Sequence, residues 1–331
     1  MIFEGSEKKF ELVVRGDVSL LDWPESRHLE LVNAAKTQIL SKIENSHVKA
    51  YLLSESSLFV WRNRMTMITC GNTTLVNAAE KAFEWLHPEQ IETFFYQRKN
   101  EYFPQLQRTG FFNDISRLNS RIAGRAFRLG RPDEHHLFLF HSDRPYNPQN
   151  DDTTLEILMY GLQGKAREIF NTPGLDVETI RRETGVADIL PGYQIDDFAF
   201  SPVGYSLNAI REDRYFTIHV TPQDESPYVS FETNMNAPAN SPEDFQKLLQ
   251  SVLEVFRPQS FDLVYFEGRN QPSSPKVNSI NGLEMPGYEL RAEIIESLSC
   301  GYDVHYVHRS QSTVLRARAH AIEIESSREG L

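Results

Sequence analysis

The feature that most constrains the fold of this chain is an order of elements that occurs twice. Each half pairs apolar strands and follows them with an amphipathic helix and another strand. The first half places strands at 51–60 and 64–70, a helix at 75–86 and a strand at 91–96; the second places strands at 195–200, 204–210, 215–221 and 227–233, a helix at 242–256 and a strand at 261–267. This order favours two antiparallel sheets, each covered by helices. Its repetition predicts an internal duplication.

Other segments complete the outline. Residues 1–15 alternate loosely and predict a strand, and apolar residues at helical spacing predict a helix over 28–43. Further expected elements are helices at 111–122, 177–184 and 314–324, a hairpin of strands 125–129 and 136–141, and strands at 154–162, 288–299 and 302–308. A stretch rich in Pro, Asn and Asp predicts the connection between the halves at 143–152.

Composition disfavours several classes of function. The 331 residues are 40% hydrophobic and 24% charged, which is ordinary for a soluble protein with a substantial core. The formal net charge of -12 disfavours a nucleic-acid or acidic-membrane partner and favours a cationic ligand. The first residues are too charged for a secretory signal, and no apolar run approaches membrane-spanning length. We therefore expect a cytoplasmic protein.

Metal chemistry is not expected from the sequence. The two cysteines, Cys70 and Cys300, are too few for a disulfide framework or a cysteine zinc site, so either thiol is available for other chemistry. The adjoining His135 and His136 come nearest to a metal motif. Neighbours on a strand face opposite ways and the sequence indicates no third ligand, so we expect no metal.

The strand predicted at 51–60 contains a local contradiction at Glu55, Ser56 and Ser57. Its flanks are apolar and favour a buried strand, but three consecutive polar residues must find partners there. The structural interpretation is an edge strand or a bulge. The chemical interpretation is self-cleavage, in which the Ser56 hydroxyl attacks the Glu55 carbonyl carbon and β-elimination of the ester leaves a pyruvoyl group. Such a ketone forms a Schiff base with an amine substrate and acts as an electron sink.

Four more short stretches carry reactive residues at unusual places. They are Thr69-Cys70-Gly71, Gly204-Tyr205-Ser206-Leu207-Asn208, Thr217-Ile218-His219-Val220-Thr221-Pro222 and Ser230-Phe231-Glu232-Thr233-Asn234. Taken singly, each has an ordinary explanation, because a lone histidine, cysteine or serine in an apolar strand is usually a structural residue.

Together these stretches resemble the eukaryotic-type S-adenosylmethionine decarboxylase proenzyme family, which is pyruvoyl-dependent. The similar segments follow the family's order across residues 3–234, with a weaker match to about 308. They are Phe3-Glu4-Gly5-x-Glu7-Lys8, Tyr51-x-Leu53-Ser54-Glu55-Ser56-Ser57, Thr69-Cys70-Gly71, Phe95-Tyr96-x-Arg98-Lys99-Asn100, Thr154-Leu155-Glu156, Gly204-Tyr205-Ser206-x-Asn208, Thr217-Ile218-His219-x-Thr221-Pro222 and Ser230-Phe231-Glu232-Thr233-Asn234.

The resemblance implies an α+β fold, a four-layer αββα sandwich over residues 1–308 with a polar tail at 309–331. It implies self-cleavage between Glu55 and Ser56 into a β chain of residues 1–55 and an α chain of residues 56–331 that begins with the pyruvoyl group. The implied enzyme uses no pyridoxal phosphate. It converts S-adenosylmethionine into CO2 and decarboxylated S-adenosylmethionine, the aminopropyl donor of spermidine synthesis.

The resemblance also implies a role for each matching residue. His219 and Ser206 match processing residues, His219 as acid or base and Ser206 as a hydrogen-bond donor to the oxygen of the scissile carbonyl. Cys70 matches the residue that returns a proton to the α-carbon. The residues implied near the substrate are the adenine-stacking rings Phe3 and Phe200, the acids Glu4 and Glu7, and Leu53 and Glu55, whose backbone groups meet the adenine edge.

Three positions depart from the family's pattern. Gln223 stands where members commonly carry an acid that holds the ribose hydroxyls, and a neutral amide makes the weaker hydrogen bond. Ile68 replaces a lysine beside an implied buried acidic cluster. Lys9 stands where relatives stimulated by putrescine have a neutral residue, so we expect its ammonium to replace the diamine; putrescine as an activator is the alternative. The implied cluster comprises Glu11, Asp152, Glu156 and Glu232.

Two other functions stay open at this point. One is a catalytically weak paralogue that acts as an activating partner subunit, which has no need to retain the processing and proton-donor residues. The other is the same cofactor chemistry on a different amino acid, an alternative raised by Gln223. The sequence fits both a monomer and a homodimer.

Overall fold

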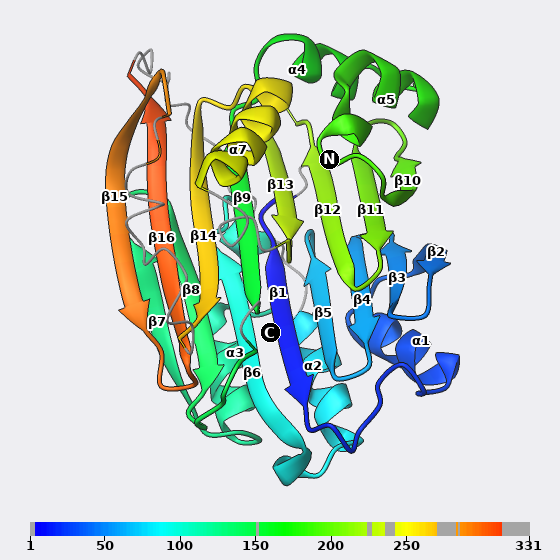
Figure 1. Cartoon of the computed structure of the whole chain (residues 1–331), viewed down its shortest axis with the longest axis vertical. Helices are drawn as coiled ribbons and strands as arrows, with labels where there is room; N and C mark the ends of the chain where they lie inside the picture. The colour runs from blue at the N-terminus through cyan, green and yellow to red at the C-terminus, as the bar shows by residue number, and fades with distance from the viewer. Residues whose placement is uncertain are drawn as a thin grey trace.

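The computed structural model describes residues 4–149, 152–223, 227–235, 242–269, 283 and 285–312. Phe3 and the helix predicted at 314–324 lie outside these residues. The described chain forms two eight-stranded sheets, and every strand pairing is antiparallel. Figure 1 shows the two sheets one behind the other.

The two sheets have the same strand order. The first comprises β1 (Lys8–Val14), β2 (Ile39–Glu44), β3 (Val48–Leu53), β4 (Ser56–Trp61), β5 (Arg64–Thr69), β6 (Ile91–Lys99), β7 (Gly124–Gly130) and β8 (His136–Ser142). The second comprises β9 (Thr153–Tyr160), β10 (Gln194–Ala199), β11 (Tyr205–Arg211), β12 (Arg214–Thr221), β13 (Tyr228–Thr233), β14 (Ser260–Gly268), β15 (Tyr288–Ser297) and β16 (Tyr302–Gln311). Their orders are β2-β3-β4-β5-β1-β6-β8-β7 and β10-β11-β12-β13-β9-β14-β16-β15, which match strand for strand and confirm the predicted duplication.

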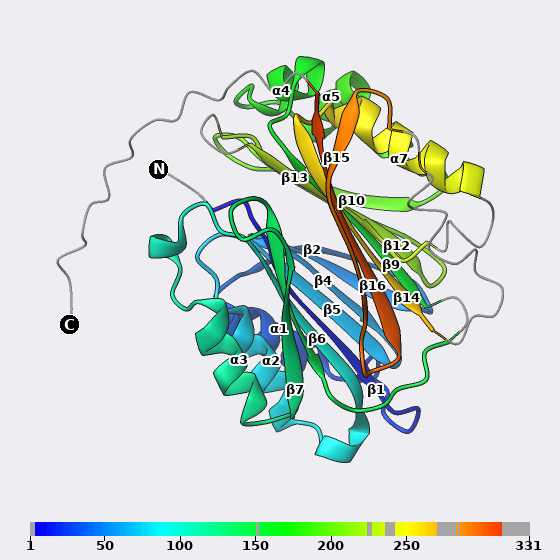
Figure 2. The same ribbon diagram turned by 90° about the vertical axis from the view of Figure 1, so that its left-hand side faces the viewer.

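Helices cover the outer face of each sheet. Those on the first sheet are α1 (Glu25–Ala34), α2 (Leu75–Glu84) and α3 (Phe111–Asn119); those on the second are α4 (Gly164–Phe170), α5 (Val177–Thr184) and α7 (Pro242–Phe256). Figure 2 shows the resulting order of helices, sheet, sheet and helices, which confirms the four-layer αββα sandwich. None of the described helices is long and apolar enough to cross a membrane.

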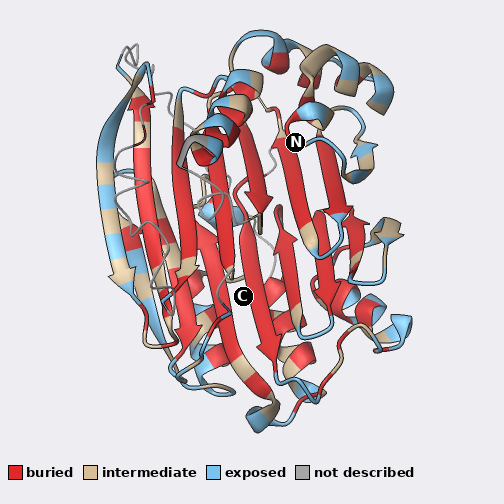
Figure 3. Cartoon of the chain, in the orientation of Figure 1, coloured by how far each residue is buried: buried red, intermediate tan, exposed pale blue. Residues whose placement is uncertain are grey.

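The layer between the sheets is charged at its centre. On β1, Phe10 and Leu12 belong to the core beneath the helices, whereas Lys9 and Glu11 alternate with them and face the second sheet. On β9, the equivalent strand, Glu156 faces inward and pairs with Lys9. Apolar clusters flank this charged centre, and Figure 3 shows that the central strands of both sheets are buried, whereas edge strands such as β15 are partly exposed.

The predicted helix over 28–43 is wrong in its second half. The helix α1 ends at Ala34, and the chain continues as β2 from Ile39. Lys36 has a φ angle of 62°, which a helix cannot accommodate, so the chain leaves the helix before the apolar spacing is exhausted. The sequence analysis also missed α4, and β16 continues to Gln311, past the expected limit at 308.

The single strand predicted at 51–60 is a hairpin. The strand β3 ends at Leu53, Ser54 and Glu55 form the turn, and β4 begins at Ser56. Of the three polar residues that contradict a continuous strand, Glu55 lies in the turn with Ser54, a usual place for polar residues, whereas Ser56 and Ser57 begin β4 and are buried.

The packing of α7 on the second sheet provides a test of the fold. Leu249 is fully buried in the core beneath α7, whereas Gln250 beside it is exposed. Leu249→Ala removes apolar burial and leaves a cavity, so we expect the free energy of unfolding in urea to fall by about 2–5 kcal/mol. Gln250→Ala should change it by less than about 0.5 kcal/mol. Equal losses in the two variants would contradict the assigned face of α7.

Candidate active site

Ser56 occupies the first position of β4, directly after the turn. It pairs with Leu53 of β3 and Thr69 of β5. The φ angle of Ser56 is 125°, a region that a residue with a Cβ atom seldom adopts and that stores backbone strain. Ser56 is 2% exposed, and no described residue forms a hydrogen bond with its hydroxyl oxygen. A strained serine whose hydroxyl is not engaged is suited to attack a neighbouring group.

The nearest electrophile is the carbonyl group of Glu55. Its oxygen accepts a hydrogen bond from the backbone N–H of Cys70 at 3.0 Å and lies 3.6 Å from the thiol of the same residue. Donors at this oxygen stabilise the negative charge that develops when a nucleophile attacks the carbonyl carbon. The sequence analysis gave this part to Ser206. In the structure the donor is Cys70, and the Ser206 hydroxyl lies against His219 instead.

His219, on β12, contacts hydroxyl groups from both sheets. Its Nδ1 is 2.8 Å from Oγ of Ser206 on β11. Its Nε2 is 2.9 Å from Oγ1 of Thr217 and 3.2 Å from Oγ of Ser57, the residue after Ser56. The imidazole therefore links the serine strand of the first sheet to the second sheet.

The hydrogen bonds around His219 assign its basic atom. The hydroxyls of Ser57 and Thr217 both donate to Oδ1 of Asn208, at 2.6 and 3.0 Å. Each hydroxyl has one proton, so both accept from Nε2–H of His219, and the lone pair on Nδ1 accepts from Ser206. Burial lowers the pKa of His219 to about 3, so the ring is uncharged at neutral pH.

The three residues that set this tautomer stand within the motifs quoted from the sequence, but no role was predicted for them. Asn208 lies two positions after Ser206 on β11, and Thr217 lies two before His219 on β12. Residues two apart on a strand share a face, so this spacing was the available signal. The sequence gave no such signal for Ser57. A continuous strand was predicted at 51–60, so the turn that orients the Ser57 side chain was not expected.

The turn after β5 is held by a buried lysine that the sequence analysis did not single out. Nζ of Lys8 donates to the carbonyl oxygens of Gly71 at 2.9 Å and Thr73 at 3.3 Å, and to Oε1 of Gln107 at 2.5 Å. Burial lowers the pKa of Lys8 to about 8. Burial also raises the pKa of the Cys70 thiol well above its ordinary value. The thiol thus stays protonated and is able to act as an acid.

Two acids lie beside this cluster, Glu7, which is buried, and Glu55, which is half-buried. Glu7 accepts hydrogen bonds from Oγ of Ser230 at 2.6 Å and from the hydroxyl of Tyr228 at 3.3 Å. Burial raises the pKa of Glu7 to about 7, against the hydrogen bond from Ser230, which lowers it. Burial likewise raises the pKa of Glu55 to about 7. Both carboxyl groups therefore titrate near neutral pH.

Glu4 is held within its own segment. Its carboxylate accepts from the N–H and the hydroxyl of Ser6, at 3.1 and 2.6 Å, and from the N–H of Phe103 at 2.7 Å. The carbonyl oxygen of Glu4 accepts from the N–H of Gly71, beside Cys70. Glu4 thus ties the start of the described chain to the turn that carries the thiol.

The remaining predicted substrate residues differ in burial. Phe200 is half-buried in the loop before β11, and its ring packs edge to face on Phe198 with centroids 5.0 Å apart. The Leu53 side chain lies in the core beneath the helices, so its backbone alone faces the turn. Gln223 follows β12 and is half-buried.

The predicted acidic cluster assembles between the sheets around Lys9. Nζ of Lys9 contacts Glu156 at 3.0 Å and Glu232 at 2.8 Å, and Lys99 contacts Glu156 at 2.6 Å. Burial would raise the pKa of Glu156, but the two lysines lower it to about 2. Burial would lower the pKa of Lys9, but the two glutamates raise it. Lys9 is therefore charged, and Ile68 is its direct cross-strand neighbour on β5.

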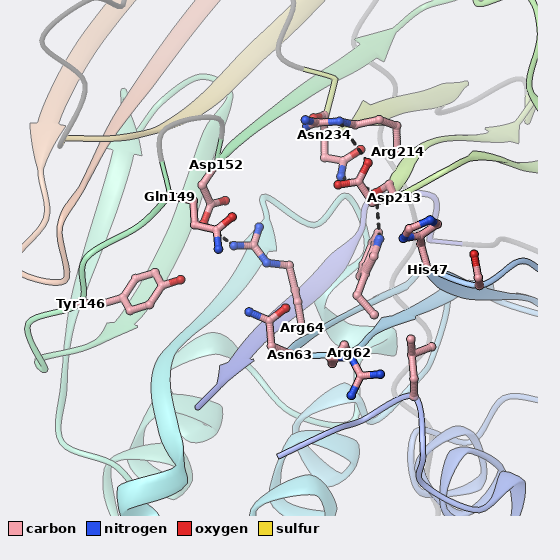
Figure 4. Close-up of a pocket in the computed structure, with 13 residues that line it drawn as sticks. His47, Arg62, Asn63, Arg64, Tyr146, Gln149, Asp152, Asp213, Arg214 and Asn234 are labelled. Atoms are coloured by element: carbon pink, nitrogen blue, oxygen red, sulfur yellow. Dashed lines mark hydrogen bonds and ion pairs between the residues drawn. The ribbon is translucent and has the colours of Figure 1, made fainter. Parts of the chain in front are cut away.

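Arg64 completes the same network. It pairs with Glu11 at 3.3 Å and with Asp152, which also accepts from the hydroxyl of Tyr302 at 2.6 Å. Both acids were predicted from the resemblance, whereas Arg64 was not singled out and Lys99 was quoted within a motif without a role. Figure 4 shows Arg64 pointing towards Asp152 in the wall of a pocket of about 320 Å³. This pocket lies by the turn after Trp61, at the opposite end of β4 from Ser56.

The fold and the site together define the class of this chain: a duplicated two-sheet sandwich in which hydroxyl, imidazole, thiol and carboxyl groups gather around one strained serine. Residues 1–309 match the family described as adenosylmethionine decarboxylase. The S-adenosylmethionine decarboxylase proenzyme of Dictyostelium discoideum is 32% identical over 325 residues, covering 91% of this chain and 84% of that protein. That of Xenopus laevis is 34% identical over 282 residues, covering 80% and 83%.

A solved structure gives the same result. The crystal structure of the Trypanosoma brucei AdoMetDC-delta26 monomer is similar with a TM-score of 0.58 and 26% identity, covering 77% of this chain and 98% of that one. The chain belongs to the adenosylmethionine decarboxylase family.

The environment of His219 provides a test of the site. Because burial lowers its pKa to about 3, we expect the ring to stay neutral from pH 8 down to about 4, with Nε2 carrying the proton. NMR of ¹⁵N-histidine-labelled protein measures both properties, and His219→Gln identifies the resonance. An imidazole that protonates near pH 6, or that carries its proton on Nδ1, would contradict the assigned network.

Proposed function

We propose that this chain is a self-cleaving, pyruvoyl-dependent decarboxylase that converts S-adenosylmethionine into its decarboxylated form, the aminopropyl donor of spermidine and spermine synthesis. The observation that carries the proposal is a strained serine, Ser56, whose hydroxyl has no partner among the described residues and which directly follows the carbonyl group of Glu55, whose oxygen already accepts from the Cys70 N–H. The names of the relatives, all S-adenosylmethionine decarboxylase proenzymes, support the reaction and the proenzyme state.

Self-cleavage begins with attack of Ser56 Oγ on the carbonyl carbon of Glu55. The oxyanion is stabilised by the Cys70 N–H, and the C–N bond breaks to leave an ester with a new amino group on Ser56. Loss of the Ser56 Cα proton then expels the Glu55 carboxylate. Tautomerisation and hydrolysis of the resulting enamine consume water and release ammonia, which leaves the pyruvoyl ketone at residue 56.

His219 serves as the base of these steps. The ring is neutral, and its Nδ1 is hydrogen-bonded to Ser206, which passes protons to and from it. Ser57 and Thr217 fix the ring by accepting from Nε2–H. Ser206 therefore positions the His219 ring and relays its protons. This role differs from the one expected from the sequence, which was to stabilise the oxyanion.

The residues that act on the substrate lie around the same turn. The pyruvoyl group supplies an electron-withdrawing carbonyl for an amine substrate. The protonated thiol of Cys70 delivers a proton to the α-carbon after CO2 leaves. Glu7 offers a carboxylate to the sulfonium, and Phe3 and Phe200 stack on adenine. Glu4 holds the segment that carries Phe3 and Glu7, while Leu53, Glu55 and Gln223 complete the substrate contacts.

A built-in ammonium takes the place of a diamine activator. Lys9 already bridges the two buried glutamates, Glu156 and Glu232, and Lys99 also pairs with Glu156. Arg64 pairs with the remaining acids, Glu11 and Asp152. A cavity of about 10 Å³ remains beside Lys9, and its lining includes Glu11 and Phe95. This volume holds about one water molecule. Among the described residues, each acid of the cluster is already paired, which supports an enzyme that needs no putrescine.

The alternatives from the sequence are not favoured. A weak paralogue acting as partner subunit has no need of the complete cluster around Ser56. Action on another amino acid rested on Gln223 alone, whereas the relatives are S-adenosylmethionine decarboxylase proenzymes. A cytoplasmic location and α and β chains from self-cleavage are part of the same proposal and rest on the family, and both a monomer and a homodimer fit it.

Intact mass of the purified protein tests self-cleavage. We expect two chains, residues 1–55 and 56–331, with the second lighter by one ammonia than a serine-headed chain. Ser56→Ala removes the nucleophile and should give a single uncut chain. Ser54→Ala, in the same turn, is the matched control and should still cleave. An uncut wild-type chain would end the proposal.

The response to putrescine tests the role of Lys9. We expect millimolar putrescine to change kcat/KM of the wild-type enzyme by less than about twofold. Lys9→Met leaves two buried glutamates without their shared cation, so it should destabilise the protein by about 3–5 kcal/mol and make its activity respond to putrescine. Strong stimulation of the wild type would contradict this role while leaving the decarboxylase assignment intact.

A further inference from the structure

A second cluster of reactive side chains lies between the sheets, away from Ser56. His135 stands in the turn between β7 and β8 of the first sheet, whereas Asp262 on β14 and His308 on β16 belong to the second. One potential ligand atom from each lies within 4.8 Å of the others. The sequence analysis noted His135 but found no third ligand, because the partners come from strands more than 120 residues away.

The contacts within this cluster are close. Nδ1 of His308 lies 2.7 Å from Oδ1 of Asp262, and Nδ1 of His135 lies 3.8 Å from Oδ2 of the same carboxylate. The hydroxyl of Tyr160 donates to Oδ2 at 2.9 Å. The two imidazole rings stack with centroids 4.7 Å apart and an angle of 12° between their planes. The Asp262 side chain is 1% exposed, that of His308 6% and that of His135 24%.

Two groups in the cluster are incompletely satisfied. Nδ1 of His135 is buried, and no described residue forms a hydrogen bond with it. The ion pairs of Asp262 are with imidazoles alone, and no lysine or arginine of the described chain pairs with it. An unbalanced buried carboxylate and an orphaned buried nitrogen are each costly, and one cation between them would satisfy both.

We propose that His135, Asp262 and His308 bind a divalent transition-metal ion, with Zn²⁺ as the best fit. Two imidazole nitrogens and one carboxylate form a three-ligand set that Zn²⁺ commonly takes, and imidazole favours such ions over Mg²⁺ or Ca²⁺. Tetrahedral ligands about 2 Å from the metal lie about 3.3 Å apart, so the existing spacing needs a small contraction. The partly exposed His135 ring turns out of its stack on His308, and Tyr160 or water takes the fourth position.

The ion would act at a distance from the reacting serine. Asp262 and His308 lie in the cross-strand row that also carries Ser230 and His219, but Asp262 is three strands from His219, about 14 Å. One ligand comes from the first sheet and two from the second. The site thus fastens the two halves of the sandwich together, a structural role that is independent of the proposed function and that replaces the expectation of no metal.

Cobalt binding tests the proposal directly. The full chain, without an affinity tag and stripped with EDTA, is titrated with Co²⁺ and followed by the visible absorption of tetrahedral cobalt, then by its displacement with Zn²⁺. We expect one Co²⁺ per chain with micromolar or tighter affinity. His135→Ala and His308→Ala should each weaken binding by more than about 100-fold.

His136→Ala is the matched control, because His136 is the next residue of the same hairpin and lies outside the cluster. It should bind Co²⁺ as the wild type does. Melting temperature gives a second measurement: Zn²⁺ should raise that of the wild type and of His136→Ala, but not that of His135→Ala. Failure of the wild type to bind Co²⁺ at about 100 μM, or binding by His135→Ala and His308→Ala as tight as that of the wild type, would overturn the site, whether or not the chain cleaves itself.

Discussion

The structure depends on a set of ion pairs buried between two sheets. Lys9, Lys99 and Arg64 come from the first sheet, and their partners Glu156, Glu232 and Asp152 come from the second half of the chain. Taking such charges out of water costs several kcal/mol for each ion, and the cost is met only where the pairs are complete. Each half of the duplication therefore buries charged side chains whose partners lie on the other half. These ion pairs determine how the two sheets face one another.

The reactive cluster is likewise assembled from residues of both sheets. The first sheet brings Ser56, Cys70 and Glu7 together at neighbouring strand ends, and the second brings His219 and Ser206. The Ser57 hydroxyl is the closest link between the two sets, because it meets both His219 and Asn208. The chemistry proposed for Ser56 thus requires the sheets to be docked, and the ion pairs beside it hold them in register.

Much of the fold could be predicted from local sequence, and the errors have local causes. Strands with alternating apolar residues and the amphipathic α7 were placed correctly because burial on one face dictates their spacing. The segment at 39–44 failed because β2 is half-exposed, so its apolar residues also fit a helical spacing.

The site shows a different limit. Ser56, Cys70 and His219 could be named because their motifs resemble a family, but the contacts that give them roles are made across the sandwich. The pairing of His219 with Ser57 joins residues 162 positions apart, and that of Lys9 with Glu232 joins residues 223 apart. No local pattern encodes such distances. For this reason no role was predicted for Lys8, Lys99 or Arg64: an isolated charge on a strand is read as solvent-facing until its partner is known.

The position of β1 has a consequence for the fate of a chain cut after Glu55. The fragment ending at Glu55 contains β1, β2 and β3, and β1 is inserted between β5 and β6, which belong to the other fragment. The strands β3 and β4 remain joined along six residue pairs on either side of the break. The two pieces are therefore interleaved within one sheet. Separating them would require breaking the backbone hydrogen bonds of β1 with β5 and β6 at the centre of the sheet. Cleavage of the backbone therefore need not destabilise the fold. The new chain end stays at the position where it forms.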